Sequence, residues 1–197
     1  MNLPNKLTSA RVLLTVVFLV VIFTGFRHYE TVALVLFCLG GITDHLDGRL
    51  ARKYNLITNF GILMDPLADK IMICSAFIAF VDLDLMPAWM VVIVVARELA
   101  ITGLRLLAAS KHAVLAAEGF GKHKTVSQIV CIISILLLLS YPDWGQAGQA
   151  IFGFSFIGSG PWIQWFTELT KWIAVLLTIV SGALYLWRNR QFYMEDM

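Results

Sequence analysis

Six apolar segments dominate the 197-residue sequence and limit what it can fold into. They centre on residues 12–26, 31–43, 71–81, 86–107, 126–141 and 172–187. The mean hydropathy is +0.79, and 59% of the residues are hydrophobic, whereas soluble domains hold roughly 45–50% apolar residues. A backbone in lipid must satisfy its polar groups internally, so each segment is expected to form a helix. We therefore predict an all-α integral membrane protein, a six-transmembrane-helix bundle that forms one domain over residues 1–197.

Basic residues fall on alternate connections between these helices and predict their orientation. One set of connections carries Lys6, Arg11, Arg49, Arg52, Lys53, Lys111, Lys122, Lys124, Arg188 and Arg190. The opposite connections hold little beyond Arg27 and Lys171. By the positive-inside rule both termini face the cytosol. Segment 142–161 is then expected to be an external glycine-rich loop.

The net charge and the cysteines argue against nucleic-acid binding, a disulfide framework and a zinc site. The net charge of +2 is too slight to indicate nucleic acid. Cys38, Cys74 and Cys131 are spread singly through apolar runs, without a CxxC motif or a histidine at metal-ligand spacing. Neither a disulfide framework nor a zinc site is therefore expected.

Four aspartates, Asp44, Asp47, Asp65 and Asp69, lie between the second and third apolar segments. Those segments, 31–43 and 71–81, are too short for the roughly 20 residues that cross a bilayer, so each helix must include the acidic residues. We predict that Asp44 and Asp47 end one helix and that Asp65 and Asp69 begin the next, at the cytosolic edge. Spacings of i,i+3 and i,i+4 put both carboxylates of a pair on one helical face, and an antiparallel hairpin brings the pairs to one depth.

Four carboxylates at one depth are expected to bind cations, because crowded like charges either raise one another's pKa or recruit counter-ions. Oxygen ligands without histidine or cysteine favour Mg²⁺ or Mn²⁺, and four of them can hold two ions that bridge phosphate oxygens. Taken singly, Asp65 before Pro66 also suits a helix N-cap, and Asp44 and Asp47 suit a solvated helix end. Four ionisable residues aligned inside the membrane boundary favour a functional site.

The same region forms a pattern at fixed spacing, made of Asp44, Asp47, Gly48, Ala51, Arg52, Gly61, Asp65 and Asp69. This pattern resembles the signature of the CDP-alcohol phosphotransferases, membrane enzymes that displace CMP from a CDP-activated molecule by an alcohol. The resemblance implies that the four aspartates hold two divalent ions and that Asp69 is also the general base. It implies contacts with CDP-diacylglycerol by Asn5, Thr8, Gly48, Ala51, Arg52, Thr58 and Gly61.

Several of these residues also have a simpler structural interpretation. Asn5 and Thr8 suit caps of the first helix. Arg52 suits a topology anchor. Ala51 and Gly61 suit close helix packing.

Three further segments, "NLPNKLTSAR", "ARELAITGLRLLAA" and "GKHKTVSQ", resemble the bacterial phosphatidylglycerophosphate synthases, a branch of that family. The resemblance implies a homodimer in the bacterial inner membrane, with its active site facing the cytosol. Its reaction would transfer the phosphatidyl group from CDP-diacylglycerol to sn-glycerol 3-phosphate, giving phosphatidylglycerophosphate and CMP. Alternatives are a cardiolipin or phosphatidylinositol-type synthase and, from another class, a divalent-cation transporter. A transporter is expected to hold its acids near the midplane on interrupted helices, often with repeated halves.

An acceptor that carries a phosphate requires cations beside the metal site. Arg97 lies about ten residues, or roughly 15 Å of helix, beyond Pro87 and hence near mid-membrane, where a charge normally faces a polar cavity. Glu98 and Arg105 are seven residues apart and share a helical face. The candidates for the acceptor phosphate are Arg97, Arg105, Lys122 and Lys124. The alternatives are a structural intramembrane charge for Arg97 and topology signals for the two lysines.

Overall fold

All regular structure in the described residues is helical, which confirms the all-α prediction. The computed structural model describes residues 3–54, 59–110, 119–155 and 160–191. Its long helices are α1 (Leu3–Thr24), α2 (Tyr29–Tyr54), α3 (Asn59–Asp82), α4 (Ala88–Ser110), α5 (Gly119–Ser140) and α7 (Trp162–Arg188). A 3-10 helix, η1 (Tyr141–Trp144), and the short α6 (Gly145–Phe152) lie between α5 and α7.

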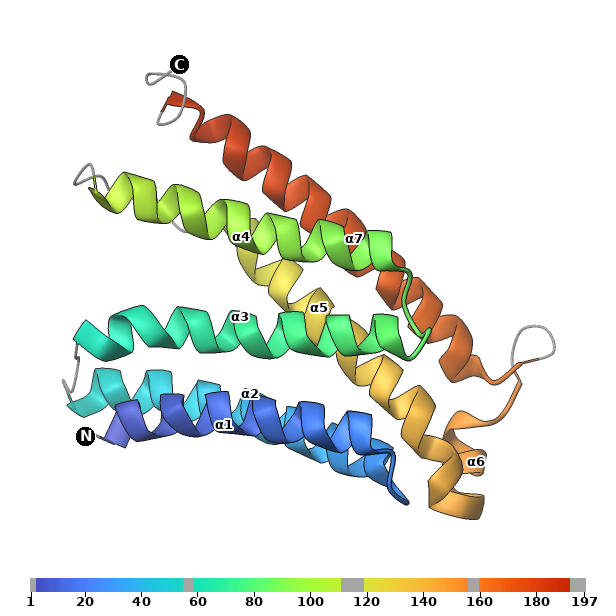
Figure 1. Ribbon diagram of the computed structural model, residues 1–197. Coiled ribbons are helices and arrows are strands. Elements are labelled where there is room, and N and C mark those ends of the chain that lie inside the picture. Colours follow the sequence, from blue (N-terminus) through green and yellow to red (C-terminus); the bar gives the residue numbers. More distant parts are fainter. Residues whose placement is uncertain (1–2, 55–58, 111–118, 156–159, 192–197) are drawn as a thin grey trace.

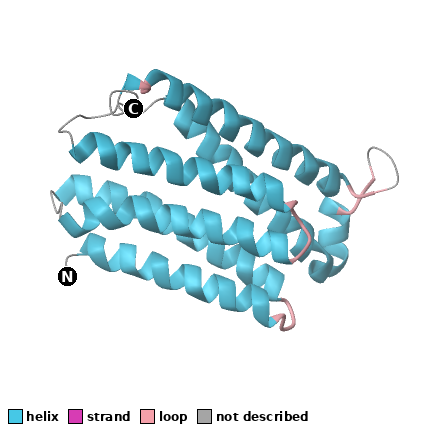
Figure 2. Ribbon diagram, turned by 45° about the horizontal axis from the view of Figure 1, so that its top comes forward, coloured by secondary structure: helices cyan, strands magenta, loops and turns pink. Residues whose placement is uncertain are grey.

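The long helices alternate in direction and form one bundle (Figure 1). We call the end of the bundle where α2 ends and α3 begins the aspartate end, and the opposite end the far end. The first turn of α1 and the last turns of α4 and α7 also lie at the aspartate end (Figures 1 and 2). Within the described residues, Lys122–Phe152 and Trp162–Arg188 are long and apolar enough to cross a membrane, and Ser9–Thr24 and Tyr29–Thr43 are shorter apolar stretches.

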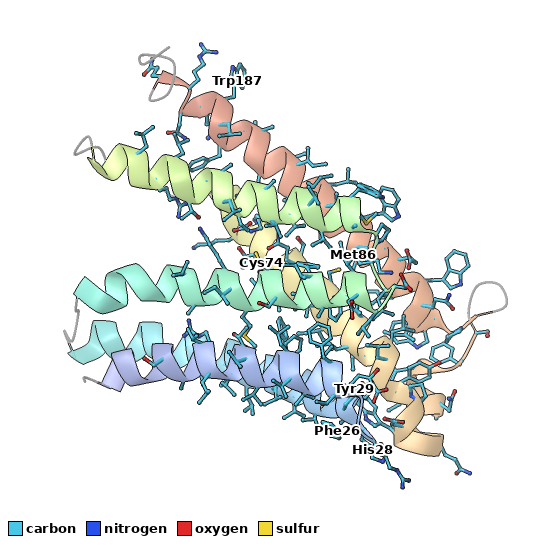
Figure 3. All side chains as sticks on the ribbon, viewed as in Figure 1. Phe26, His28, Tyr29, Cys74, Met86 and Trp187 are labelled. Atoms are coloured by element: carbon cyan, nitrogen blue, oxygen red, sulfur yellow. The ribbon has the colours of Figure 1, made fainter. Side chains whose placement is uncertain are left out.

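The hydrophobic core fills the part of the bundle toward the far end, where all the long helices contribute large apolar side chains (Figure 3). Fully buried members are Phe18, Phe77, Phe80, Val94, Ile132, Ile135 and Leu136. Outward-facing apolar side chains remain exposed on every long helix, for example Leu13, Val35 and Leu176. An apolar exterior around an apolar core is the pattern of a helix bundle surrounded by lipid.

The helices that carry the aspartates extend further than predicted. α2 continues seven residues beyond Asp47, and α3 begins six residues before Asp65. The prediction that these residues end and begin helices was therefore wrong by about two turns. Leu50, Ala51 and Arg52 are good helix formers and prolong α2 after the apolar run stops.

The N-cap interpretation of Asp65 was also wrong. Pro66 is the eighth residue of α3, so Asp65 lies inside the helix and does not cap it. A proline inside a helix removes one backbone hydrogen bond. The position therefore needs an explanation other than helix capping.

The expected external loop over residues 142–161 was wrong for its first half, which forms η1 and α6. The ring of Phe152 packs against those of Tyr141, Trp144 and Trp162, with centroid distances of 6.3, 5.8 and 6.0 Å. A side chain at Gly148 would overlap the carbonyl oxygen of Tyr141. Glycine therefore allows α6 to fold back against η1.

Lys171 belongs to a helix and not to a connection. α7 begins at Trp162, which places Lys171 nine residues inside it. Its side chain is buried and its Nζ lies 2.6 Å from Glu168 Oε1. Pairing with Glu168 explains how a lysine is accommodated in this helix.

At Gly40 of α2 an added Cβ would overlap the sulfur and methyl group of Met72 of α3, so the end of the Met72 side chain lies against this glycine. Replacing Gly40 with leucine should therefore overpack this contact, which costs about 1–3 kcal/mol, and lower the thermal unfolding temperature in detergent. Gly41→Leu is the matched control, because nothing lies within 4 Å of a Cβ at Gly41. Equal destabilisation by the two substitutions would contradict the close approach.

Candidate active site

The first aspartate pair lies on the inward-facing stripe of α2. Ala33, Phe37 and Gly40 are buried and follow one another at spacings of four and three residues. Asp44 and Asp47 continue this spacing toward the aspartate end. Positions so spaced lie on one face of a helix, so both aspartate positions share the face of α2 on which Ala33, Phe37 and Gly40 are buried.

The second aspartate pair occupies the corresponding stripe of α3. Met72, Ala76 and Phe80 are buried at successive spacings of four residues. Asp69 and Asp65 precede Met72 by three and seven residues and extend the same face. Both helices therefore carry their acidic positions on stripes that begin in the hydrophobic core.

The contact between Gly40 and Met72 sets the relative level of the two pairs. Asp44 follows Gly40 by four residues, and Asp69 precedes Met72 by three, so both backbone positions lie roughly 5 Å further toward the aspartate end. Asp47 and Asp65 are each seven residues away, or roughly 10 Å. The four positions thus form two levels, each with one aspartate from each helix.

Several predicted site residues lie outside the described side chains, and their roles stay predictions. These are Asn5, Thr8, Asp44, Asp47, Gly48, Ala51, Arg52, Gly61, Asp65 and Asp69. Thr58 lies outside the described residues altogether. Among the side chains that are described, no group of three His, Cys, Asp or Glu residues is close enough to hold a metal ion. The aspartates of α2 and α3 therefore remain the candidate metal ligands.

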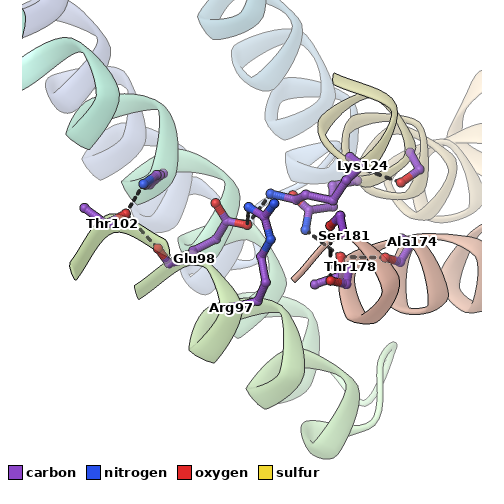
Figure 4. Close-up of polar contacts among 10 residues, drawn as sticks. Arg97, Glu98, Thr102, Lys124, Ala174, Thr178 and Ser181 are labelled. Carbon is purple, nitrogen blue, oxygen red and sulfur yellow. Dashed lines mark hydrogen bonds and ion pairs between the residues drawn. The ribbon is translucent and has the colours of Figure 1, made fainter. Parts of the chain in front are cut away.

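A buried carboxylate joins two of the predicted acceptor-binding cations. Arg97 Nη1 donates to Glu98 Oε1 at 3.2 Å, and Lys124 Nζ donates to the same oxygen (Figure 4). The side chains of Glu98 and Lys124 are only 8% and 3% exposed. The structure thus brings Arg97 and Lys124 together at an ion-paired site between α4 and α5.

Lys70 is a member of this cluster that the sequence analysis missed. Its Nζ donates to Thr102 Oγ1, which in turn donates to the carbonyl oxygen of Glu98 at 2.7 Å. The charges of Glu98, Arg105 and Arg97 are close enough to act on Lys70. The available signal was a lysine next to Asp69, at the start of an apolar run where a charged residue is costly.

The other two predicted cations differ in their surroundings. Arg105 Nε donates to the hydroxyl of Tyr185 at 3.2 Å, and its guanidinium lies 5.5 Å from the centre of that ring. Lys122 is exposed near the start of α5. Within the described part of the chain it joins none of the contacts that link Arg97 and Lys124, so the structure does not place it in the cluster.

Polar side chains continue from this cluster along the contact between α5 and α7. Gln128 donates to Thr178 Oγ1 at 3.0 Å, and the hydroxyls of Ser134 and Thr170 lie 2.8 Å apart. All four side chains are buried. Hydrogen bonds of this kind hold helices together in lipid, so α7 is fixed against the helix that carries Lys124.

Arg11 is a further buried cation near the aspartate end. The residue is 1% exposed and lines a cavity of about 100 Å³ together with Gly40 and Met72. From sequence, Arg11 suits either a lipid phosphate or the membrane surface at a helix end. The guanidinium is buried inside the bundle and does not lie at that surface.

Comparison with known proteins identifies the class of enzyme. Residues 1–180 match the model of the CDP-alcohol phosphatidyltransferase family, and the chain belongs to that family. This confirms the family predicted from the aspartate pattern.

Three individual relatives within the family are similar to this chain over most of its length. The chain is 37% identical to a CDP-diacylglycerol--glycerol-3-phosphate 3-phosphatidyltransferase of Bacillus subtilis (strain 168), over 95% of each protein. It is 32% identical to an enzyme of the same description from Rickettsia felis, over 98% of this chain and 97% of the relative. A probable phosphatidylglycerophosphate synthase of Mycobacterium tuberculosis is 42% identical over 72% of this chain and 68% of the relative.

The Glu98 site makes a prediction about stability. Replacing Glu98 with alanine leaves the buried Lys124 and the partly buried Arg97 without their carboxylate, which should cost about 3–5 kcal/mol and lower the thermal unfolding temperature in detergent. Glu168→Ala is the comparison, because the Glu168 side chain is 55% exposed and pairs only with Lys171 among the described residues. A smaller loss at Glu98 than at Glu168 would show that the shared ion pair contributes little.

Proposed function

We propose that the chain transfers the phosphatidyl group of CDP-diacylglycerol to sn-glycerol 3-phosphate, forming phosphatidylglycerophosphate and CMP. The observation that carries this proposal is that the acidic stripes of α2 and α3, with aspartate positions at two matching levels, lie in the same bundle as a group of cations around the buried Glu98. The first suits a metal-bound diphosphate, and the second suits an acceptor that bears a phosphate. The printed names of the relatives from Bacillus subtilis and Rickettsia felis support this choice of acceptor.

The donor set at the aspartate stripes fits hard divalent cations, since it offers carboxylate oxygens alone. We propose that Asp44, Asp47, Asp65 and Asp69 hold two Mg²⁺ or Mn²⁺ ions. When bound, such a pair neutralises the diphosphate and stabilises the attacking and leaving oxygens of a displacement. Gly48, Ala51 and Gly61 leave room for the nucleotide, while Asn5, Thr8, Arg52 and Thr58 supply polar contacts to it.

Asp69 is proposed as the general base toward the acceptor. It accepts the proton of the primary hydroxyl of glycerol 3-phosphate, and the hydroxyl oxygen forms a bond to the phosphorus that carries the diacylglycerol. The bond from that phosphorus to the bridging oxygen breaks, and CMP leaves with the electron pair. A carboxylate within hydrogen-bond reach of the acceptor hydroxyl is the group that such a proton transfer requires.

We propose that the acceptor phosphate binds Arg105, Arg97 and Lys124. Together with Lys70 these residues form a surface that we call the cationic wall, and Lys122 would lie at its outer rim. Arg105 is exposed and is not paired with Glu98, whereas Arg97 and Lys124 are already paired with it. A guanidinium offers a planar fork to phosphate oxygens. Arg105 is therefore expected to contribute most of the direct contact.

The membrane placement follows from where the two substrates meet. We propose that the aspartate end faces the cytosol in the bacterial inner membrane, with six helices crossing the bilayer and both termini on the cytosolic side. CDP-diacylglycerol then enters from the inner leaflet, with its acyl chains in lipid and its diphosphate at headgroup depth. The homodimer implied by the family stays a prediction.

Two alternatives remain to be tested against this proposal. A cardiolipin or phosphatidylinositol-type synthase would share the aspartates but accept a different alcohol. A divalent-cation transporter would hold its acids near the membrane midplane. Asp47 and Asp65 lie about two turns from the aspartate end, whereas Asp44 and Asp69 lie near the middle of α2 and α3. The CMP-release assay, and not the position of the aspartates, therefore distinguishes the enzyme from the transporter.

A CMP-release assay tests the reaction itself. Purified protein in detergent, given CDP-diacylglycerol and Mg²⁺ or Mn²⁺, should release CMP with glycerol 3-phosphate and much less with glycerol, inositol or phosphatidylglycerol, because only the first brings a small phosphate to the cationic wall. Addition of EDTA should stop release. Faster release with inositol or phosphatidylglycerol would assign another branch of the family, and metal uptake into vesicles without CMP release would assign a transporter.

Replacement of Asp69 with asparagine tests the base. It keeps an oxygen ligand but removes the proton acceptor, so CMP release should fall at least about a hundredfold while binding of the donor, measured by calorimetry with CDP-diacylglycerol, changes little. Asp82→Asn, at the other end of α3 and exposed, is the matched control. Retained turnover in Asp69→Asn would remove this residue from the chemistry.

Replacement of Arg105 with glutamine tests the acceptor site. Loss of a charge-assisted contact to phosphate should raise KM for glycerol 3-phosphate about tenfold or more and leave KM for CDP-diacylglycerol unchanged. Arg190→Gln serves as the control, since Arg190 is exposed beyond the end of α7 and contacts the ring of Trp187. An increase confined to the donor KM would move Arg105 to the donor site.

A further inference from the structure

The last turns of α7 lie against both arginines of the proposed acceptor site. Gly182 approaches Arg97, and Tyr185, three residues later, contacts Arg105. Both arginines come from α4, so one helix supports two cations of its neighbour. The aspartate pattern and the cation assignments drew no residue from this part of the chain.

At Gly182 the contact is with the base of the Arg97 side chain. A Cβ added to Gly182 would lie 2.9 Å from Arg97 Cγ and 3.9 Å from its Cβ. These atoms are close to the backbone of α4 and cannot move aside without turning the whole side chain. At its other end Arg97 donates to Glu98. The arginine is therefore held at two points, and glycine is the residue that allows this approach.

At Tyr185 the contact leaves part of the Arg105 guanidinium available. Tyr185 is 3% exposed and packs with Ile101 and Leu104 of α4, so its ring is fixed. Its hydroxyl accepts from Nε, and its ring lies beside the guanidinium. Within the described part of the chain, the contacts of Arg105 do not use its two terminal amino groups. Those groups are the ones that bind phosphate oxygens as a fork.

The location of these residues in the sequence is informative as well. The family model matches residues 1–180, so Gly182 and Tyr185 lie just beyond the part that defines the family as a whole. The family pattern contains the aspartates that handle the CDP group, which every member uses. The cations Arg97, Arg105 and Lys124 lie within the matched residues, whereas the two residues of α7 that contact the arginines lie just after them.

We propose that Gly182 and Tyr185 are positioning residues for the acceptor phosphate, which hold Arg97 and Arg105 in the conformations that bind it. This inference rests on the proposed function of the site. It assigns acceptor recognition to three helices, because α7 supports the arginines of α4 while α5 supplies Lys124. Neither residue is expected to contact the donor or to take part in the chemical step.

The test separates acceptor binding from donor binding and turnover. CMP release by the full chain in detergent is measured against glycerol 3-phosphate at saturating CDP-diacylglycerol, and then with the roles reversed. Gly182→Ala should raise the acceptor KM about tenfold, and Tyr185→Phe about fivefold, the factor that corresponds to one hydrogen bond. For both variants kcat and the donor KM should stay within about twofold of the wild-type values, as positioning of one substrate requires.

Matched controls make the same two kinds of substitution elsewhere in the chain. Gly103→Ala adds a methyl group on α4 where nothing lies within 4 Å of the new Cβ, and Tyr141→Phe removes a hydroxyl at the far end. Both should leave the acceptor KM unchanged. If Gly182→Ala does not fold, Tyr185→Phe carries the test, because it removes a single oxygen and keeps the buried ring.

The outcomes distinguish this inference from the function on which it rests. If the wild-type protein releases no CMP with glycerol 3-phosphate, the proposed function fails first. If the wild type is active but Tyr185→Phe and a folded Gly182→Ala leave the acceptor KM unchanged, the positioning role is overturned alone. Equal changes in donor KM, acceptor KM and kcat would assign the two residues to general packing and would also overturn it.

Discussion

Toward the aspartate end, the contacts between helices depend on one oxygen of Glu98, Oε1, which binds both Arg97 and Lys124. A cation removed from water without a partner costs several kcal/mol, and in lipid no solvent can compensate for it. Because the carboxylate is shared, one negative charge from α4 holds a cation of its own helix and one of α5. The same turn of α4 receives Lys70 of α3 through Thr102. Three helices are thereby fixed around one ion-paired group.

This arrangement divides the molecule along its length. Toward the far end the buried side chains are large and apolar, such as Phe77, Phe80 and Ile132. Toward the aspartate end the stripes of α2 and α3 change from apolar to acidic at Asp44 and Asp69. Apolar packing in one part holds the helices in register, so that the acidic positions of the other part reach matching levels. The core thus positions the site although it contributes no chemistry.

Much of this architecture could be predicted from the sequence, because in lipid a long apolar run has to be a helix. The spacing of the aspartates likewise placed them on single faces, and the buried stripes of α2 and α3 agree with it. The helix ends were not predictable from hydropathy, since Leu50 and Ala51 continue α2 by helix propensity alone. Lys70 and Tyr185 were missed for another reason: their partners, Thr102 and Arg105, lie 32 and 80 residues away and only the fold brings them together.

The position of α3 explains how one small bundle can bring together two substrates that are both anionic. Asp69 and Lys70 are consecutive residues, so their backbone positions lie about 100° apart around the helix at nearly the same depth. Lys70 contacts Thr102 of α4, while Asp69 continues the stripe of Met72, which packs near Gly40 of α2. If the donor diphosphate binds at the acidic stripe and the acceptor phosphate at the cationic wall, α3 forms the boundary between them. The proposed base then lies where the acceptor hydroxyl must meet the donor phosphorus. Positive charge binds both phosphate groups, but it comes from metal ions on one side of the helix and from protein side chains on the other.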